Sequence, residues 1–190
     1  MLDAQLGRYV TQDDQLRDTP ADPVALDRLV TGLRADLAAA RARGDTAAVR
    51  ERLGRLGDAL RVASGAAGGY EEPVAMLTEA LRMSQESADA PGVVASRIRL
   101  AEALRDAGRP DTAEPLLRAA LSLAGAECPE YLDHAWYALG TCQLILGDPT
   151  GAVRSFQVAV SLCHGRSAGP LLAVAERALT LARDAQARSA

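Results

Sequence analysis

Cysteine and histidine side chains gather in the last third of the chain, and these residue types bind zinc or act as nucleophiles in enzymes. They are Cys128, His134, Cys142, Cys163 and His164. A structural zinc site needs four converging ligands, and the spacing here matches neither C-x2-C nor H-x3-H. Cys163 and His164 are adjacent in a predicted helix and point about 100° apart, so they do not face each other as a nucleophile and its base. The sequence therefore predicts no metal site, and it predicts three reduced cysteines that pack as apolar residues.

Other catalytic signatures are missing as well. The chain contains no Walker loop, no G-x-S-x-G, no H-E-x-x-H and no G-x-G-x-x-G. The glycine-rich stretch 65–69 lacks the Lys-Ser/Thr pair of a phosphate-binding loop, so we interpret it as a turn. Carboxylates such as Glu102 and Asp106 fall on predicted helix surfaces, where such pairs are usually solvated. These observations predict a non-catalytic protein that needs no cofactor.

Amphipathic helices must position any site in this chain. Apolar residues recur at spacings of three and four, which is the helical period, and Leu26, Leu29, Val30, Leu33 and Leu37 form the first such run. Aromatic residues make up only 3% of the chain, so the core must be built from Ala, Leu and Val, whose small side chains suit closely packed helices. The pattern predicts an all-α fold of about eight helices separated by glycine-containing turns.

An internal repeat organises the middle of the chain. Gly68, Gly108 and Gly147 stand 40 and 39 residues apart, and four columns of small and large residues stay in phase with them. The columns are Leu60, Leu100 and Leu139; Pro73, Ala113 and Ala152; Leu77, Leu117 and Phe156; and Ala80, Ala120 and Ala159. An irregular Ala/Leu-rich bundle is the alternative, but four columns in phase over three copies favour a repeat.

The third copy carries the most specific pattern. It reads Trp136-x2-Leu139-Gly140, then Gly147-Asp148-Pro149, then Ala152-x3-Phe156-x2-Ala159. This pattern resembles the tetratricopeptide repeat (TPR), a helix–turn–helix unit of about 34 residues. The resemblance implies a right-handed α–α superhelix. The first copy departs from the pattern, because Gly57 and Arg61 stand in the columns of Trp136 and Gly140.

The repeat pattern also divides the chain. We expect TPR-like repeats at about 54–87, 94–127 and 133–164, and helices at 24–43 and 168–187 that cap the ends of the apolar stack. Residues 24–190 then form a single domain. The preceding residues 1–23 carry five aspartates against two arginines and are largely polar, so we predict an acidic, flexible leader there.

Charge and composition exclude several classes of partner. The net charge is −4, whereas general nucleic-acid and anionic-membrane binders are usually basic. No apolar run reaches the length of a transmembrane helix, and the first residues lack the apolar core of a signal peptide. Together with three irregularly spaced cysteines, these features predict a cytoplasmic protein. All basic residues are arginine, and lysine and asparagine are absent, which indicates a GC-rich bacterial coding sequence.

In the family that this chain resembles, the first helix of each pair lines a concave face that binds peptide segments. The residues expected on that face are Arg55, Ile98, Arg99, Glu102, Arg105, His134, Tyr137, Thr141, Leu144 and Ile145. Arginine suits carboxylates, and exposed aromatic and aliphatic groups suit an apolar anchor. Because the chain lacks Lys and Asn, the clamp that some family members use on a terminal carboxylate is not expected.

The predicted function is therefore a protein–protein interaction scaffold with a concave groove. Its partner would be another protein or a peptide segment, extended or helical, with at least one acidic residue. The first alternative is a self-associating structural protein, in which the terminal caps pair two chains as a homo-oligomer, or a regulatory sensor. The second alternative is an enzyme or metal protein without a recognisable motif.

Overall fold

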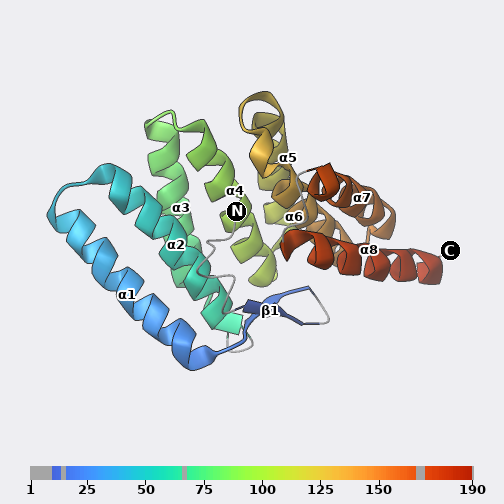
Figure 1. Cartoon of the computed structure of the whole chain (residues 1–190), viewed down its shortest axis with the longest axis horizontal. Helices are drawn as coiled ribbons and strands as arrows, with labels where there is room; N and C mark the ends of the chain where they lie inside the picture. The colour runs from blue at the N-terminus through green and yellow to red at the C-terminus, as the bar shows by residue number, and fades with distance from the viewer. Residues whose placement is uncertain (1–9, 14–15, 66–67, 166–169, 190) are drawn as a thin grey trace.

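The computed structural model describes residues 10–13, 16–65, 68–165 and 170–189. Over these ranges it contains eight α-helices, each of which packs mainly on the next one in the sequence (Figure 1). Their bounds are α1 Pro23–Ala42, α2 Thr46–Ser64, α3 Glu71–Glu86, α4 Ala90–Asp106, α5 Pro110–Glu127, α6 Leu132–Ile145, α7 Pro149–Gly165 and α8 Pro170–Ser189, and the short 3-10 helix η3 Pro129–Tyr131 precedes α6. The predicted all-α fold class is confirmed.

Alternate helices form two layers. Besides its neighbours in the sequence, α2 contacts α4, α4 contacts α6, and α6 contacts α8. These contacts are more extensive than those between alternate helices of the other layer, α1, α3, α5 and α7. The stack therefore curves toward the layer of α2, α4, α6 and α8, which we call the concave layer. It contains the first helix of each predicted pair.

Short polar signals start and end the helices. Asp22, Asp45 and Asp89 cap α1, α2 and α4, because each carboxylate accepts a hydrogen bond from a backbone N–H in the first turn. The three glycines that set the predicted repeat share one left-handed conformation, with φ values of 76°, 76° and 78°. Glycine adopts this φ more readily than other residues, and the turns at Gly108 and Gly147 match in their hydrogen bonds as well, because each glycine N–H donates to the carbonyl three residues earlier, of Arg105 and of Leu144.

Small residues face large ones inside each repeat. Leu77, Leu117 and Phe156 are all 0% exposed. A Cβ atom on Gly140 would lie 2.6 Å from the Phe156 ring, so only glycine lets α6 and α7 approach this closely. The paired small and large columns predicted for the third copy are therefore packing positions.

The register of the first helix in the first copy differs from the prediction. Gly57, not Arg61, is the equivalent of Gly140, because a Cβ on Gly57 would lie 2.7 Å from Leu77. Gly57 precedes Leu77 by 20 positions, whereas Gly140 precedes Phe156 by 16. The connection 65–70 between α2 and α3 is longer than the connections 107–109 and 146–148 in the later copies, so the residue of α2 that packs on Leu77 lies further from it in the sequence.

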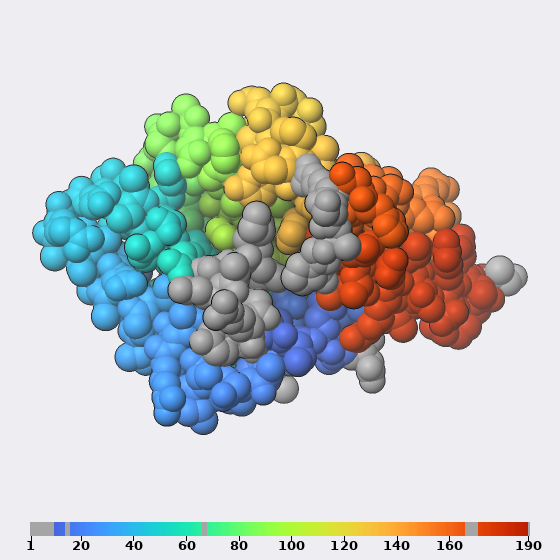
Figure 2. Space-filling model, viewed as in Figure 1, coloured from blue at the N-terminus to red at the C-terminus, as the bar shows by residue number. Residues whose placement is uncertain are grey.

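A β-hairpin precedes the helices and was not predicted. Strand β1, Val10–Gln12, pairs antiparallel with β2, Asp18–Pro20, and β2 contacts α2. In Figures 1 and 2 the hairpin lies beside α8 as well, below the centre of the stack. The structure thus differs from the predicted flexible leader at residues 10–13 and 16–22, whereas residues 1–9 and 14–15 of that segment lie outside the described part. The hairpin is ordered by tertiary contacts that its polar composition does not reveal.

Phe156 offers a direct test of the repeat packing. We expect Phe156→Ala to lower the free energy of unfolding by about 3–5 kcal/mol, because it leaves a cavity between α6 and α7. Val158→Ala, on the same helix but 37% exposed, is the control and should change it by less than about 1 kcal/mol. Urea unfolding of both variants measures the difference. An equal effect of the two substitutions would contradict this packing.

Candidate functional site

A fully buried arginine lies on α2, the first helix of the concave layer. The Arg61 side chain of α2 is 0% exposed and donates hydrogen bonds to three carboxylates. Nε and Nη2 donate to Oδ1 of Asp58 at 3.0 and 2.9 Å, Nη1 donates to Oδ2 of Asp106 at 2.9 Å, and Nη2 donates to Oδ2 of Asp18 at 2.7 Å. Glu102 Oε2 lies 4.0 Å from Nη2. Arg61 thus joins α2, α4 and the hairpin.

Two further arginines of α4 extend this cluster. Arg105 is 4% exposed; its Nε and Nη2 donate to Oδ1 of Asp106 at 2.9 and 2.7 Å, and its Nη1 donates to the Thr141 hydroxyl at 2.9 Å. The side chain of Arg99 is 21% exposed, with Nε 3.9 Å from Oδ2 of Asp58. That oxygen is buried and accepts no hydrogen bond from the described residues. We call Asp18, Asp58, Arg61, Arg99, Glu102, Arg105 and Asp106 the carboxylate–arginine cluster.

Burial and the surplus of carboxylates shift protonation equilibria in the cluster. Burial raises the pKa of Glu102 from 4.5 to about 7; Arg61 and Arg105 oppose this rise, whereas Asp58 and Asp18 add to it. Burial alone would lower the pKa of Arg61, but the surrounding carboxylates hold it well above its ordinary value. Burial therefore favours the protonated form of Glu102 relative to an exposed glutamate.

The hairpin continues the site toward α6, α7 and α8. Gln12 Nε2 donates hydrogen bonds to the Tyr137 hydroxyl at 2.9 Å and to Oδ1 of Asp18 at 3.1 Å. The Tyr137 ring packs against Phe156, with centroids 5.7 Å apart. Leu16, 2% exposed, joins the apolar cluster that contains both rings and Ala178 of α8. Burial raises the pKa of the Tyr137 hydroxyl, so this group stays a neutral hydrogen-bonding partner.

The structure brings five of the ten predicted groove residues together. Arg99, Glu102 and Arg105 belong to the carboxylate–arginine cluster, and Tyr137 and Thr141 bond to the hairpin and to the cluster. Arg105, Tyr137 and Thr141 are buried, however, at 4%, 6% and 2% exposure. The prediction that they line an open groove is wrong for this conformation, because the hairpin and the cluster cover them.

The other five predicted residues do not belong to the carboxylate–arginine cluster. Ile98 is 4% exposed and packs in the apolar core. Arg55 forms an ion pair with Glu51 of its own helix, and His134 lies against Asp133 at the start of α6. Leu144 is half-buried against the apolar cluster of α7 and α8, and Ile145, at the end of α6, is 44% exposed.

The sequence prediction missed Arg61, Asp106, Asp18 and Gln12 as site residues. One signal was present. Arg55-x2-Asp58-x2-Arg61 and Arg99-x2-Glu102-x2-Arg105 are the same R-x2-[D/E]-x2-R motif. With the corrected register of the first copy, the two motifs occupy equivalent positions of α2 and α4. Spacings of three put all three side chains on one helix face, so the repeated motif predicts a charged surface on the concave layer.

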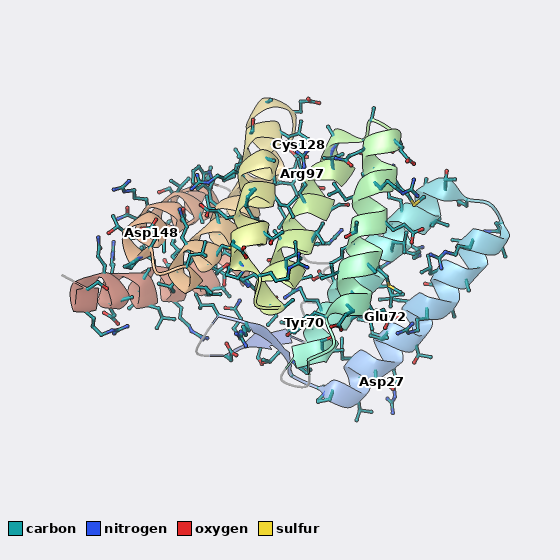
Figure 3. All side chains as sticks on the ribbon, turned by 180° about the vertical axis from the view of Figure 1, so that it is seen from behind. Asp27, Tyr70, Glu72, Arg97, Cys128 and Asp148 are labelled. Atoms are coloured by element: carbon teal, nitrogen blue, oxygen red, sulfur yellow. The ribbon has the colours of Figure 1, made fainter. Side chains whose placement is uncertain are left out.

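Outside the cluster, the other candidate features of the described chain are the cysteines, the potential metal ligands and the apolar helix surfaces. Cys128, Cys142 and Cys163 are buried, no disulfide joins them, and burial raises the pKa of Cys142 to about 12. Figure 3 shows Cys128 at the end of α5 that lies away from the hairpin. Over the described ranges, no three Cys, His, Asp or Glu side chains are grouped to hold a metal ion. None of the described helices is long and apolar enough to cross a membrane.

Comparisons with known proteins do not assign the chain to a family. No protein-family model matches it, and a search of curated proteins finds no match. The TPR resemblance therefore stays a prediction based on the third copy, whereas the stack of helix pairs is a property of the structure.

Arg61 should be essential for stability. We expect Arg61→Leu to lower the free energy of unfolding by about 3–5 kcal/mol at pH 7, because the carboxylates around it lose their buried counter-charge. The control is Arg82→Leu, which removes an exposed arginine paired with Glu86 one turn away and should cost less than about 1 kcal/mol. Denaturant unfolding measures both. Equal losses in the two variants would show that the cluster does not stabilise the fold.

Glu102 should make stability fall as pH rises. In the folded chain its pKa is about 7, against an ordinary value of 4.5. The folded state therefore binds more protons between these values, and the free energy of unfolding decreases from about pH 4.5 to about pH 7. We expect Glu102→Gln to flatten this decrease, with Glu79→Gln as the control, because Glu79 is a partly exposed glutamate of α3 that pairs with Arg41 outside the cluster. Urea titrations from pH 5 to pH 8 measure the slope, and an unchanged slope in Glu102→Gln would contradict the assignment.

Proposed function

We propose that this chain is a non-catalytic protein-interaction module, a TPR-like scaffold whose concave layer binds an extended protein segment with an acidic side chain. One observation carries the proposal. An extended segment with a carboxylate, the hairpin, already lies on this layer and accepts a hydrogen bond from Arg61 at 2.7 Å through Asp18. We therefore propose that an external segment binds as the hairpin does, with a carboxylate that accepts a hydrogen bond from an arginine of this layer.

Accessible charge supports binding at the same layer. The Arg99 side chain is 21% exposed, whereas Arg61 and Arg105 are covered, so Arg99 is the arginine of the cluster that an external carboxylate can reach first. A guanidinium group suits this role because it can bind a carboxylate with two parallel hydrogen bonds. Ile145 and Leu146, 44% and 42% exposed at the end of α6, add apolar surface for an anchor.

The pairing within the cluster supports binding rather than catalysis. A general acid or base must reach a substrate atom, and a nucleophile must be held by its base. Here the hydrogen-bonding groups of Arg61, Arg105 and Asp106 are directed at one another, inside a region that the hairpin covers. Such an arrangement holds elements together and discriminates between charged ligands.

The proposal is tested by capturing partners from the native cell with immobilised protein. We expect Arg99→Glu to lose the specific partner, because a carboxylate then repels the acidic segment. The control is Arg118→Glu, the same change at an exposed arginine of α5, which should capture the partner like the wild type. Quantitative mass spectrometry at low and high salt measures capture, and binding to the wild type should weaken as salt rises. Equal capture by all three proteins would place the partner elsewhere and contradict the proposed site.

A further inference from the structure

The hairpin occupies the surface that the proposed function assigns to a partner. It touches three helices of the concave layer through polar contacts. Asp18 bonds to Arg61 of α2, Gln12 bonds to Tyr137 of α6, and the Asp13 carbonyl accepts a hydrogen bond from Arg177 of α8. It thereby combines what was predicted for an external ligand: an extended backbone, a carboxylate against arginine and an apolar side chain in the layer.

Leu16 is held as an anchor at a conformational cost. Its φ is 60°, in the left-handed region where glycine is preferred and where a bulky side chain is strained. The position nevertheless carries leucine, and its side chain is 2% exposed in the apolar cluster with Tyr137 and Ala178. Burial of the side chain offsets the strain only while the hairpin is docked. Leu16 therefore stabilises docking rather than the hairpin itself.

The charge balance of the layer limits the strength of docking. Without the hairpin, the cluster contains three arginines, Arg61, Arg99 and Arg105, and three carboxylates, Asp58, Glu102 and Asp106. Asp18 is the fourth carboxylate, and it contributes to the raised pKa of Glu102, which is a sign of like-charge repulsion. Docking thus gains a hydrogen bond between Asp18 and Arg61. Repulsion between carboxylates offsets part of that gain, which leaves the hairpin displaceable.

The connection to the rest of the chain allows the hairpin to leave. Ala21 and Asp22, which link β2 to α1, are exposed, and Asp22 caps α1 through its own side chain. The strands are three residues each, and an isolated hairpin of this size is not stable in water. Removal of the hairpin from the layer therefore requires no helix to unfold, and the released segment has little structure of its own.

We propose that the hairpin is an intramolecular ligand of the concave layer, and that the external partner displaces it with a segment that carries an apolar side chain and, two residues later, a carboxylate. The spacing is that of Leu16 and Asp18. This inference rests on the proposed function and adds both the recognition pattern of the partner and the regulation of the site. Access to the layer is then set by the fraction of molecules whose hairpin is undocked.

The test uses the chain's own segment as a probe in trans. A fluorescent synthetic peptide of residues 10–22 is titrated into the full-length wild type and into the full-length double variant Leu16→Ser/Asp18→Ala, which lacks both anchors of the hairpin. We expect the double variant to bind the peptide at least about tenfold more tightly, because a tethered segment competes at millimolar effective concentration. The matched control is Thr11→Ser/Arg17→Ala, which changes two exposed residues of the same hairpin and should bind like the wild type.

Two further measurements make the result specific. A peptide with the same Leu16→Ser and Asp18→Ala changes should not bind the double variant. Hydrogen exchange over residues 10–20, followed by mass spectrometry, should be faster in the double variant than in the wild type, and saturating peptide should speed it up in the wild type.

The outcomes separate this inference from the proposed function. Equal peptide affinity in wild type and double variant would overturn displacement and leave the interaction module standing. Absence of binding to both, with helical circular dichroism and cooperative melting intact, would overturn the hairpin as a ligand of the layer, whereas the interaction module is contradicted only by equal partner capture in wild type, Arg99→Glu and Arg118→Glu. If the double variant loses its helical signal, Asp18→Asn takes its place, since it keeps the hairpin's size and removes one charge. It should bind the peptide more tightly than the wild type, and unchanged affinity would again overturn displacement.

Discussion

A single buried guanidinium group, that of Arg61, joins two helices and the hairpin. Arg61 cannot be left without counter-charges in the interior, because an unpaired buried charge costs several kcal/mol. Its guanidinium group donates hydrogen bonds to Asp58 of its own helix, to Asp106 of α4 and to Asp18 of the hairpin. This arrangement links α2, α4 and the hairpin, in addition to the packing of α2 and α4 on α3. A cluster of this kind also ties the placement of the hairpin to charge and to pH.

The fold combines a regular scaffold with an irregular inner surface. The contacts between α6 and α7, with Gly140 against Phe156, are the contacts that a repeat requires, and their equivalents recur in the earlier copies. The concave layer does not recur in the same way. The first two copies carry the R-x2-[D/E]-x2-R motif, whereas the third copy presents Tyr137 and Thr141. The charged half of the layer holds Asp18 and the aromatic half holds Leu16, so the hairpin bridges two different environments.

Much of the scaffold could be predicted from the sequence alone. Helix periods, aspartate caps and left-handed glycines are local features, because each depends on residues within one or two turns. The buried columns of the second and third copies follow from the same periodicity, since small residues must face large ones where helices approach closely. Arg99, Glu102, Arg105, Tyr137 and Thr141 were also placed on one surface, because spacings of three and four define a helix face.

The register of the first copy and the docking of the hairpin depend on tertiary contacts, which no local sequence pattern shows. The longer connection 65–70 changes how α2 meets α3, so the register of the first copy depends on a packing contact, Gly57 against Leu77. An acidic, polar segment is expected to be solvated, yet residues 10–13 and 16–20 dock, because Arg61 of α2 donates a hydrogen bond to Asp18 and an apolar cluster receives Leu16. The helices and their order follow from the sequence. Which charges are buried, and what covers the concave layer, depends on partners far apart in the chain.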